Sequence, residues 1–171
     1  YLASRLDNKW KLVSGFFISK KKINSKSGIN YNVNKSRVYN SLESFIKYEK
    51  KKLDAIVLLT PTPTHSKILK DLKNINLPII SEKPLINSAD QMKKVNNIFL
   101  RKNTIRVTYN YTGYPILREL KEMLKNKKIG QLKQFFFYMP QNAFISKTSQ
   151  KIKPKTWRLN DIGYPNILGD L

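Results

Sequence analysis

The stretch that decides the fold is DAIVLLTPTPTHSKILKDL, which runs from Asp54 to Leu72. Its first part, Asp54–Leu59, is a short and nearly continuous apolar run, which is typical of a parallel strand buried on both faces. The turn TPTPTH at Thr60–His65 interrupts this run, and apolar residues then recur at helical spacing from Ile68 onward. This order predicts one strand–turn–helix unit of an α/β sheet.

Similar units lie on both sides of this stretch. Apolar runs predict further strands over Trp10–Ile18, Arg37–Tyr39, Pro78–Ile80 and Thr104–Thr108, and amphipathic spacing predicts helices over Ser41–Lys50 and from Ser88 onward. This alternation predicts an α/β fold with a doubly wound parallel sheet of Rossmann type. From Tyr109 a second α/β unit begins, with a helix from Pro115 and a strand over Leu132–Met139. We therefore place a domain boundary between residues 108 and 109.

The composition excludes several kinds of site. The 171 residues include no cysteine and one histidine, which excludes disulfides, thiolate metal sites, cysteine nucleophiles and His clusters, so we expect no metal. No apolar run approaches the roughly 20 residues of a membrane span, and no signal peptide is visible. We expect a cytoplasmic protein with no membrane partner.

The formal net charge of +22 first suggests a nucleic-acid partner. The 33 basic residues are spread along the whole chain, and only 6 of them are Arg, which is a poor supply for bidentate readout of guanine or phosphate. Lys, Ile and Asn are all abundant and share A/T-rich codons, so a biased genome is a simpler cause of the charge. We predict no nucleic-acid partner. A basic nucleic-acid binder stays open as a hypothesis and ranks behind the two functions given at the end of this subsection.

Two motifs directly follow predicted strands, namely Thr60–His65 and Ser81–Pro84. Ligands of open parallel sheets bind beyond the carboxyl ends of the strands, so both motifs are candidates for a binding site. Lys83, held by the proline that follows it, can present an ammonium group to a substrate oxygen. A solvated loop lysine is the simpler interpretation, and this motif alone does not exclude it.

Four passages, taken in order, resemble the glucose-fructose oxidoreductase/inositol dehydrogenase/rhizopine-catabolism (Gfo/Idh/MocA) family of dinucleotide-dependent oxidoreductases. DAIVLLTPTPTHSKILKDL resembles the family's strand, T-P-N-x-x-H turn and helix, and PIISEKPL resembles its E-K-P motif. VTYNYTGYPILRELKEMLKNKKIGQL resembles the passage into the second domain. TWRLNDIGYPNILGDL resembles the W-R segment and the start of the D-x-x-x-H motif. The match covers nearly the whole chain.

The resemblance implies two catalytic residues in this chain. Lys83 matches the E-K-P lysine, which contacts the nicotinamide region and the substrate hydroxyl, and whose charge would stabilise a developing alkoxide. Asp170 matches the aspartate that positions substrate and base. The family's general base is a histidine four residues later, a position past Leu171.

The resemblance also implies a set of residues that line the dinucleotide, namely Thr60, Pro61, His65, Glu82, Lys83, Trp157 and Arg158. Two of these residues have alternative interpretations, because His65 could be a structural turn histidine and Trp157 could be a core anchor. Thr62 stands where the family usually has Asn, which would weaken one cofactor contact.

The choice of cofactor depends on the end of the strand that precedes Ser19. An acidic residue there normally binds the ribose 2′-hydroxyl of NAD. Here the strand is followed by Ser19 and Lys20–Lys22 instead. A hydroxyl group and nearby cations would tolerate a 2′-phosphate, so we predict NADP rather than NAD, with Ser19 and Lys20 as cofactor-binding residues.

The resemblance implies hydride transfer between nicotinamide and a hydroxyl or carbonyl carbon of a sugar or polyol. It also implies a domain over 1–108 that binds the dinucleotide and lacks its first strand and glycine loop, and the beginning of a substrate and oligomerisation domain over 109–171. We expect an interior fragment with little or no turnover by itself, a homo-oligomer when complete, and an unpaired central sheet edge. The alternative is a non-catalytic binding or regulatory protein, or a gene remnant, that retains the fold.

Overall fold

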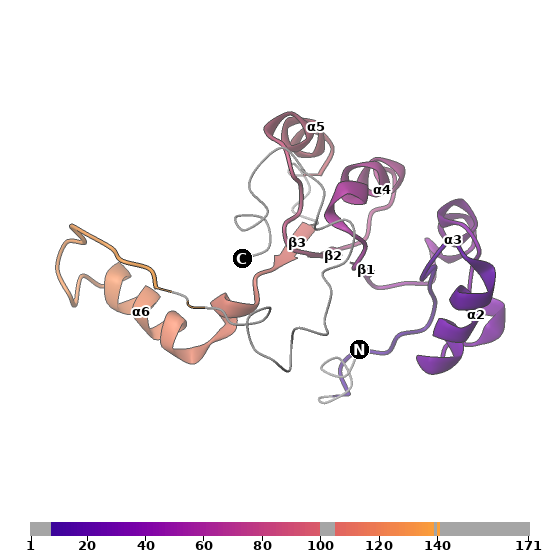
Figure 1. The fold of residues 1–171 in the computed structure, drawn as a ribbon, viewed down its shortest axis with the longest axis horizontal. Helices are drawn as coiled ribbons and strands as arrows, with labels where there is room; N and C mark the ends of the chain where they lie inside the picture. The colour runs from indigo at the N-terminus through magenta and orange to yellow at the C-terminus, as the bar shows by residue number, and fades with distance from the viewer. Residues whose placement is uncertain (1–7, 100–104, 139, 141–171) are drawn as a thin grey trace.

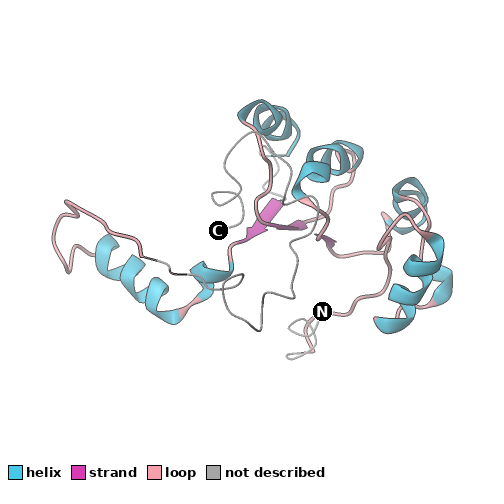
Figure 2. Cartoon of the chain, in the orientation of Figure 1, coloured by secondary structure: helices cyan, strands magenta, loops and turns pink. Residues whose placement is uncertain are grey.

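The computed structural model of the chain describes residues 8–99, 105–138 and 140 (Figure 1). The centre of the fold is a sheet of three parallel strands in the order β1-β2-β3, formed by β1 (Ile56–Leu58), β2 (Ile79–Glu82) and β3 (Ile105–Thr108). The helices α4 (His65–Asp71) and α5 (Ala89–Phe99) connect these strands and lie on the same side of them (Figure 2). The structure therefore confirms the predicted order of parallel strands and helices between Asp54 and Thr108.

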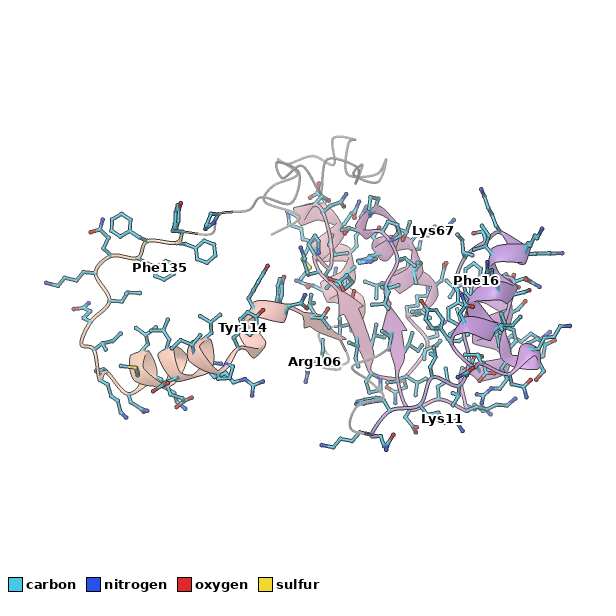
Figure 3. All side chains as sticks on the ribbon, turned by 60° about the horizontal axis from the view of Figure 1, so that its bottom comes forward. Lys11, Phe16, Lys67, Arg106, Tyr114 and Phe135 are labelled. Atoms are coloured by element: carbon cyan, nitrogen blue, oxygen red, sulfur yellow. The ribbon has the colours of Figure 1, made fainter. Side chains whose placement is uncertain are left out.

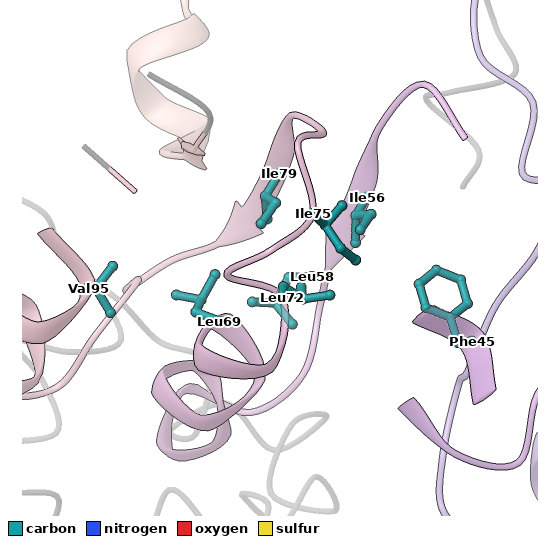
Figure 4. Close-up of a cluster of buried hydrophobic side chains, with 8 residues drawn as sticks. All are labelled: Phe45, Ile56, Leu58, Leu69, Leu72, Ile75, Ile79 and Val95. Atoms are coloured by element: carbon teal, nitrogen blue, oxygen red, sulfur yellow. The ribbon is translucent and has the colours of Figure 1, made fainter. Parts of the chain in front are cut away.

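One apolar cluster holds the sheet against the helices. Its buried members come from β1, β2, α4, α5, the helix α3 (Leu42–Glu49) and the turn after α4: Phe45, Ile56, Leu58, Leu69, Leu72, Ile75, Ile79 and Val95 (Figure 4). Leu69 and Ile79 are completely buried. Burying an aliphatic side chain of this size contributes about 1.5–3 kcal/mol, so this cluster is the main stabilising element of the described fold.

The prediction that Asp54–Leu59 is buried on both faces is wrong for one face. Ile56 and Leu58 point into the cluster, whereas Val57 is 52% exposed. Successive side chains of a strand point to opposite faces, and the described helices that follow β1 and β2 cover only the face of Ile56 and Leu58. The apolar run thus predicted the strand correctly, but it did not indicate that one face of the strand is left exposed.

The N-terminal part is less regular than the sequence predicts. The expected strands Trp10–Ile18 and Arg37–Tyr39 are reduced to one parallel bridge between Gly15 and Val38. Part of the second segment is occupied by a short 3-10 helix, η1 (Lys35–Arg37), which precludes a longer ladder. Between the two segments lies α2 (Lys21–Asn30). The predicted helix at Ser41–Lys50 is confirmed as α3, where the Ser41 hydroxyl accepts the N–H of Ser44 at 3.1 Å as an N-cap.

Close approach of α2 to Val38 depends on Gly28. A Cβ placed on Gly28 would lie 2.5 Å from Val38 Cγ2, whereas a Cβ on Gly113 would have no atom within 4 Å. A glycine-to-alanine change in a helix normally stabilises it, because alanine loses less backbone entropy on folding.

We therefore expect Gly28→Ala and Gly113→Ala to have opposite effects on stability. Overpacking against Val38 should make Gly28→Ala destabilising by about 1–2 kcal/mol in urea unfolding. Gly113→Ala should be neutral or stabilising by about 0.5 kcal/mol, because its site is open. A gain of stability in both variants would contradict the close packing of α2 on Val38.

A buried ion pair joins the Arg37–Tyr39 segment to the end of α3. The side chain of Glu49 is completely buried, and its carboxylate accepts from Arg37 Nε at 2.9 Å, from the second guanidinium nitrogen of Arg37, and from the Tyr39 hydroxyl at 2.8 Å. The hydrogen bonds from Arg37 are the main cause that lowers the pKa of Glu49, and the bond from Tyr39 acts in the same direction. This cluster fixes the packing of α3 beside the two N-terminal segments.

The region after β3 contains a short 3-10 helix, η4 (Asn110–Gly113), and α6 (Pro115–Lys125), which begins at the proline as predicted. The strand expected at Leu132–Met139 is not formed over residues 132–138, because no described segment pairs with it; Met139 lies outside the described residues. Phe135–Tyr138 are instead exposed, at a distance from the sheet (Figure 3). No helix within the described ranges has the length and apolar character needed to cross a bilayer.

Candidate functional site

The candidate site lies at the carboxyl edge of β1 and β2. Leu58 pairs with Ser81 in the parallel register. Thr60 and Lys83 each lie two residues beyond this pair, so the two strand-end motifs leave the sheet at the same edge. Thr60, Glu82 and Lys83 are half-buried and Pro61 is exposed. Register alone thus brings together four of the residues that the sequence assigned to the site.

His65 fastens the two motifs to each other. Its imidazole is completely buried, with Nδ1 3.0 Å from the carbonyl oxygen of Leu85 and Nε2 2.6 Å from the carbonyl oxygen of Thr60. A neutral ring donates to one of these oxygens and a protonated ring to both. The geometry favours the structural interpretation of His65, because both ring nitrogens face backbone and none of its surface is exposed.

Removing this link should be costly for stability. His65→Leu would remove the buried ring that faces the carbonyl oxygens of Thr60 and Leu85 and leave at least one of them without its donor, so we expect a loss of about 1–3 kcal/mol in chemical unfolding. Lys67→Leu is the matched control, since Lys67 is exposed on the same helix (Figure 3), and should change stability by less than about 0.5 kcal/mol. Equal effects of the two changes would show that the link to the two carbonyls has no stabilising role.

The turn after β1 is closed by its own hydroxyl groups. The short 3-10 helix η2 (Thr62–Thr64) follows Pro61, and Thr64 Oγ1 lies 2.8 Å from Thr60 Oγ1 and donates to the Pro61 carbonyl oxygen at 2.7 Å. Thr62 is buried, with 4% of its surface exposed. The residue at the position where the family usually has Asn is therefore largely removed from solvent.

The loop after β2 is anchored on its other side by β3. Thr108 Oγ1 donates to the carbonyl oxygen of Ser81 at 3.2 Å, and Ser81 is completely buried. The Lys83–Pro84 peptide bond is cis. Lys83 is therefore displayed from a loop that is held by β3 before it and by His65, through Leu85, after it.

Ser19 and Lys20 form a separate part of the candidate site. Both are exposed at the turn between the Trp10–Ile18 segment and α2, and Lys20 is the N-cap residue of α2 without a side-chain cap bond. The Gly15–Val38 bridge shows that this segment runs parallel to its neighbour, so Ser19 lies beyond the carboxyl end of the bridged segment, as Thr60 lies beyond β1. An exposed hydroxyl and three successive lysines at such a position are compatible with an adenosine ribose or its 2′-phosphate.

Trp157, Arg158 and Asp170 lie outside the described residues and remain predictions. Conversely, sequence reasoning missed Asn24, a completely buried amide in α2. It lies in a polar, Asn-rich stretch, and only its contacts distinguish it from its exposed neighbours. Within the part of the chain that the structure describes, no three His, Asp or Glu side chains gather as a metal site.

A parallel sheet with helical crossovers and polar turns at its carboxyl edge defines an α/β domain of the Rossmann type. The chain belongs to the Gfo/Idh/MocA family, whose model, described as an oxidoreductase family with an NAD-binding Rossmann fold, matches residues 7–111. This match confirms the fold class and the family that the sequence motifs predicted.

Individual relatives agree with the family match. The uncharacterized oxidoreductase YfiI of Bacillus subtilis is 26% identical over 99% of this chain and 45% of its own length. An oxidoreductase from Sinorhizobium meliloti is 30% identical, with a TM-score of 0.70 over 75% of this chain and 38% of that structure. An inositol dehydrogenase homologue from Azotobacter vinelandii, in complex with NAD+, shares the fold at 21% identity and a TM-score of 0.76, over 99% of this chain and 45% of that structure. The chain spans less than half the length of these relatives.

Proposed function

We propose that the chain is the dinucleotide-binding part of an NAD(P)-dependent oxidoreductase that acts on a hydroxyl or carbonyl carbon of a sugar or polyol. The observation that carries the proposal is the junction of the Thr60–His65 turn and the Glu82–Lys83–Pro84 loop at one sheet edge, joined by the buried ring of His65. The nicotinamide coenzyme, when bound, supplies the hydride chemistry. The chain itself would bind the coenzyme at this edge and orient the substrate.

Lys83 is the catalytic residue of the proposal within the described chain. An ammonium group beside the substrate oxygen would stabilise the negative charge that develops there as the carbon is oxidised, or donate to that oxygen in the reverse direction. Asp170 would position the substrate with Lys83. Trp157 and Arg158 would complete the coenzyme contacts of Thr60, Pro61 and Glu82.

The substrate class is a proposal that rests on related structures. A homologue of inositol dehydrogenase from Azotobacter vinelandii was solved with NADH and myo-inositol, and the WlbA dehydrogenase from Bordetella pertussis with NADH and UDP-GlcNAcA. Both ligands carry several hydroxyl groups, as expected for a site that recognises a sugar or polyol. We also propose a domain boundary between residues 108 and 109, a cytoplasmic location and a homo-oligomer for the whole protein.

We propose NADP as the preferred coenzyme. The turn after residue 18 carries Ser19 and Lys20–Lys22 and no acidic side chain, so a 2′-phosphate would meet a hydroxyl and cations rather than a carboxylate. Related structures include complexes with NADH and a protein named as NADPH-dependent from Desulfitobacterium hafniense, so the family accommodates either choice.

Titration of the chain with NADPH and NADH, followed by coenzyme fluorescence, tests the proposal. Saturable binding of both coenzymes, tighter for NADPH, is expected. Tighter binding of NADH would overturn the NADP preference alone, and no binding of either coenzyme would overturn the proposed function. Absorbance at the nicotinamide band with a panel of sugars and polyols, measured on the whole protein that contains this chain, then separates an enzyme from a non-catalytic binding protein of the same fold.

A further inference from the structure

Asn24 is a buried amide with hydrogen-bond partners on both of its polar atoms. Its Oδ1 accepts the backbone N–H of Phe17 at 2.9 Å and of Ile18 at 3.4 Å, and its Nδ2 donates to the Tyr39 carbonyl oxygen at 2.7 Å. Nδ2 also lies 3.4 Å from Asn40 Oδ1. A backbone N–H can only donate and a carbonyl oxygen can only accept, so these partners fix the orientation of the amide.

These contacts hold the turn that contains Ser19. The side chain of Asn24 binds the N–H of Ile18, which precedes Ser19, and the backbone N–H of Asn24 donates to the carbonyl oxygen of Lys20 at 2.9 Å. Ser19 therefore lies between Ile18, which the Asn24 side chain holds, and Lys20, whose carbonyl oxygen accepts a helical backbone bond that any residue at position 24 would make. Its own side chain is exposed, so the direction of its hydroxyl follows from a backbone that Asn24 anchors.

Asn24 also connects this turn to the neighbouring segment. Gly15 and the segment around Val38 form the single parallel bridge of this region, through bonds from Gly15 N–H to the Arg37 carbonyl at 3.1 Å and from Tyr39 N–H to the Gly15 carbonyl at 2.9 Å. The bond from Asn24 Nδ2 to the Tyr39 carbonyl extends this connection towards the carboxyl ends of both segments. Because the ladder is so short, the side chain of Asn24 connects the two segments through hydrogen bonds where further strand pairing would otherwise connect them.

We propose that Asn24 is a positioning residue for coenzyme selectivity, because it holds Ser19 and Lys20 in the orientation in which they meet the 2′ position of the adenosine ribose. This inference rests on the proposed function. An amide suits the role, because it offers an acceptor to Phe17 and Ile18 and a donor to Tyr39 in one plane. Leucine has nearly the same size and offers neither.

The test compares two nucleotides that differ only at the 2′ position, adenosine 2′,5′-bisphosphate and adenosine 5′-monophosphate. The measured quantity is the ratio of their dissociation constants for the wild-type chain, for Asn24→Leu, and for Asn30→Leu as the matched control. Asn30 is exposed at the other end of the same helix. Partial unfolding weakens the apparent affinity for both nucleotides by the same factor, so a purely structural role of Asn24 leaves the ratio unchanged.

We expect Asn24→Leu to lower the preference for the nucleotide with the 2′-phosphate by about tenfold, the effect of losing one well-placed charge-assisted hydrogen bond. Asn30→Leu should keep the wild-type ratio. Amide NMR signals of Ser19 and Lys20 should shift in Asn24→Leu and not in Asn30→Leu. If the leucine variant does not fold, Asn24→Ala, which removes the same hydrogen bonds in a better helix former, takes its place with Asn30→Ala as its control.

Two results would overturn the inference, and they are distinguishable. A wild-type ratio retained in Asn24→Leu or Asn24→Ala would exclude a role of Asn24 in selectivity and leave the proposed function intact. Failure of the wild-type chain to bind either nucleotide, together with failure to bind NADPH and NADH, would overturn the proposed function and this inference with it.

Discussion

Replacement of Lys83 with methionine is expected to lower kcat by about 10²–10³-fold, the usual effect of removing one group that stabilises charge in the transition state. Methionine keeps the length and apolar stem of lysine but has no charge to offer the substrate oxygen. The KM for coenzyme should change much less, because the interaction with the reacting oxygen strengthens as its charge develops. Steady-state kinetics of the proposed oxidoreductase, with the substrate found in the sugar and polyol panel, measure both quantities.

Lys67→Met is the matched control for this experiment. Lys67 is exposed on α4, and its loss removes the same charge from the same lysine-rich chain without reaching the sheet edge (Figure 3). Its kcat should remain within about twofold of the wild type. Turnover by Lys83→Met at the level of the control would exclude Lys83 from the chemistry. Dinucleotide binding without turnover in the wild type would favour a binding or regulatory protein.

Replacement of Glu49 with glutamine is expected to lower the free energy of unfolding at pH 7 by about 3 kcal/mol, the low end for breaking a buried ion pair. The low end applies because the Arg37 side chain is 30% exposed and can be partly hydrated when it loses its partner. Glutamine preserves the shape of the side chain but carries no charge and cannot accept from all three donors. Urea unfolding followed by circular dichroism measures the loss.

The cost of this substitution should depend on pH in a defined direction. The pKa of Glu49 is lowered in the folded chain from 4.5, mainly by its hydrogen bonds from Arg37, so the wild type gains stability where the carboxylate is ionised. The gain is fully present above the unfolded pKa and is lost as pH falls through the lower folded pKa. The difference between wild type and Glu49→Gln should therefore shrink on acidification below about pH 4.5.

Glu43→Gln provides the control on the same helix. Glu43 is exposed in the first turn of α3, so its replacement should cost no more than about 0.5 kcal/mol, the contribution of a carboxylate near a helix N-terminus. A difference between wild type and Glu49→Gln that grows on acidification would contradict the assignment of the ion pair.

The sequence predicted those parts of the fold that local patterns determine. The apolar run of β1, the amphipathic spacing of α3 and the proline start of α6 each depend on residues within one strand or helix, and each is confirmed. Burial of Val57 and strand pairing at residues 132–138 depend on whether another segment covers or pairs with them. A single apolar run contains no information on such partners, and both expectations were wrong in the described structure.

In the candidate site, too, the sequence predicted the features that follow from local patterns and not those that depend on contacts between distant segments. The parallel arrangement of β1 and β2 implies that Thr60 and Lys83 leave the sheet at one edge, which the register confirms. The link from His65 to Leu85 spans 20 residues, and the four contacts of Asn24 join three separate segments. Nothing in the local sequence distinguishes Asn24 from Asn30, the other asparagine of its helix, so only the structure could identify it.

Phe135, Phe136, Phe137 and Tyr138 form a row of four aromatic residues with 66%, 82%, 71% and 88% of their surfaces exposed. Aromatic residues favour extended backbone, and a short uncharged run of them is a preferred site for intermolecular β-pairing. The high net positive charge opposes such contacts through mutual repulsion, and this repulsion weakens as salt screens it. Raising the ionic strength should therefore promote self-association of this chain. The high positive charge thus keeps the exposed aromatic row from pairing with other copies.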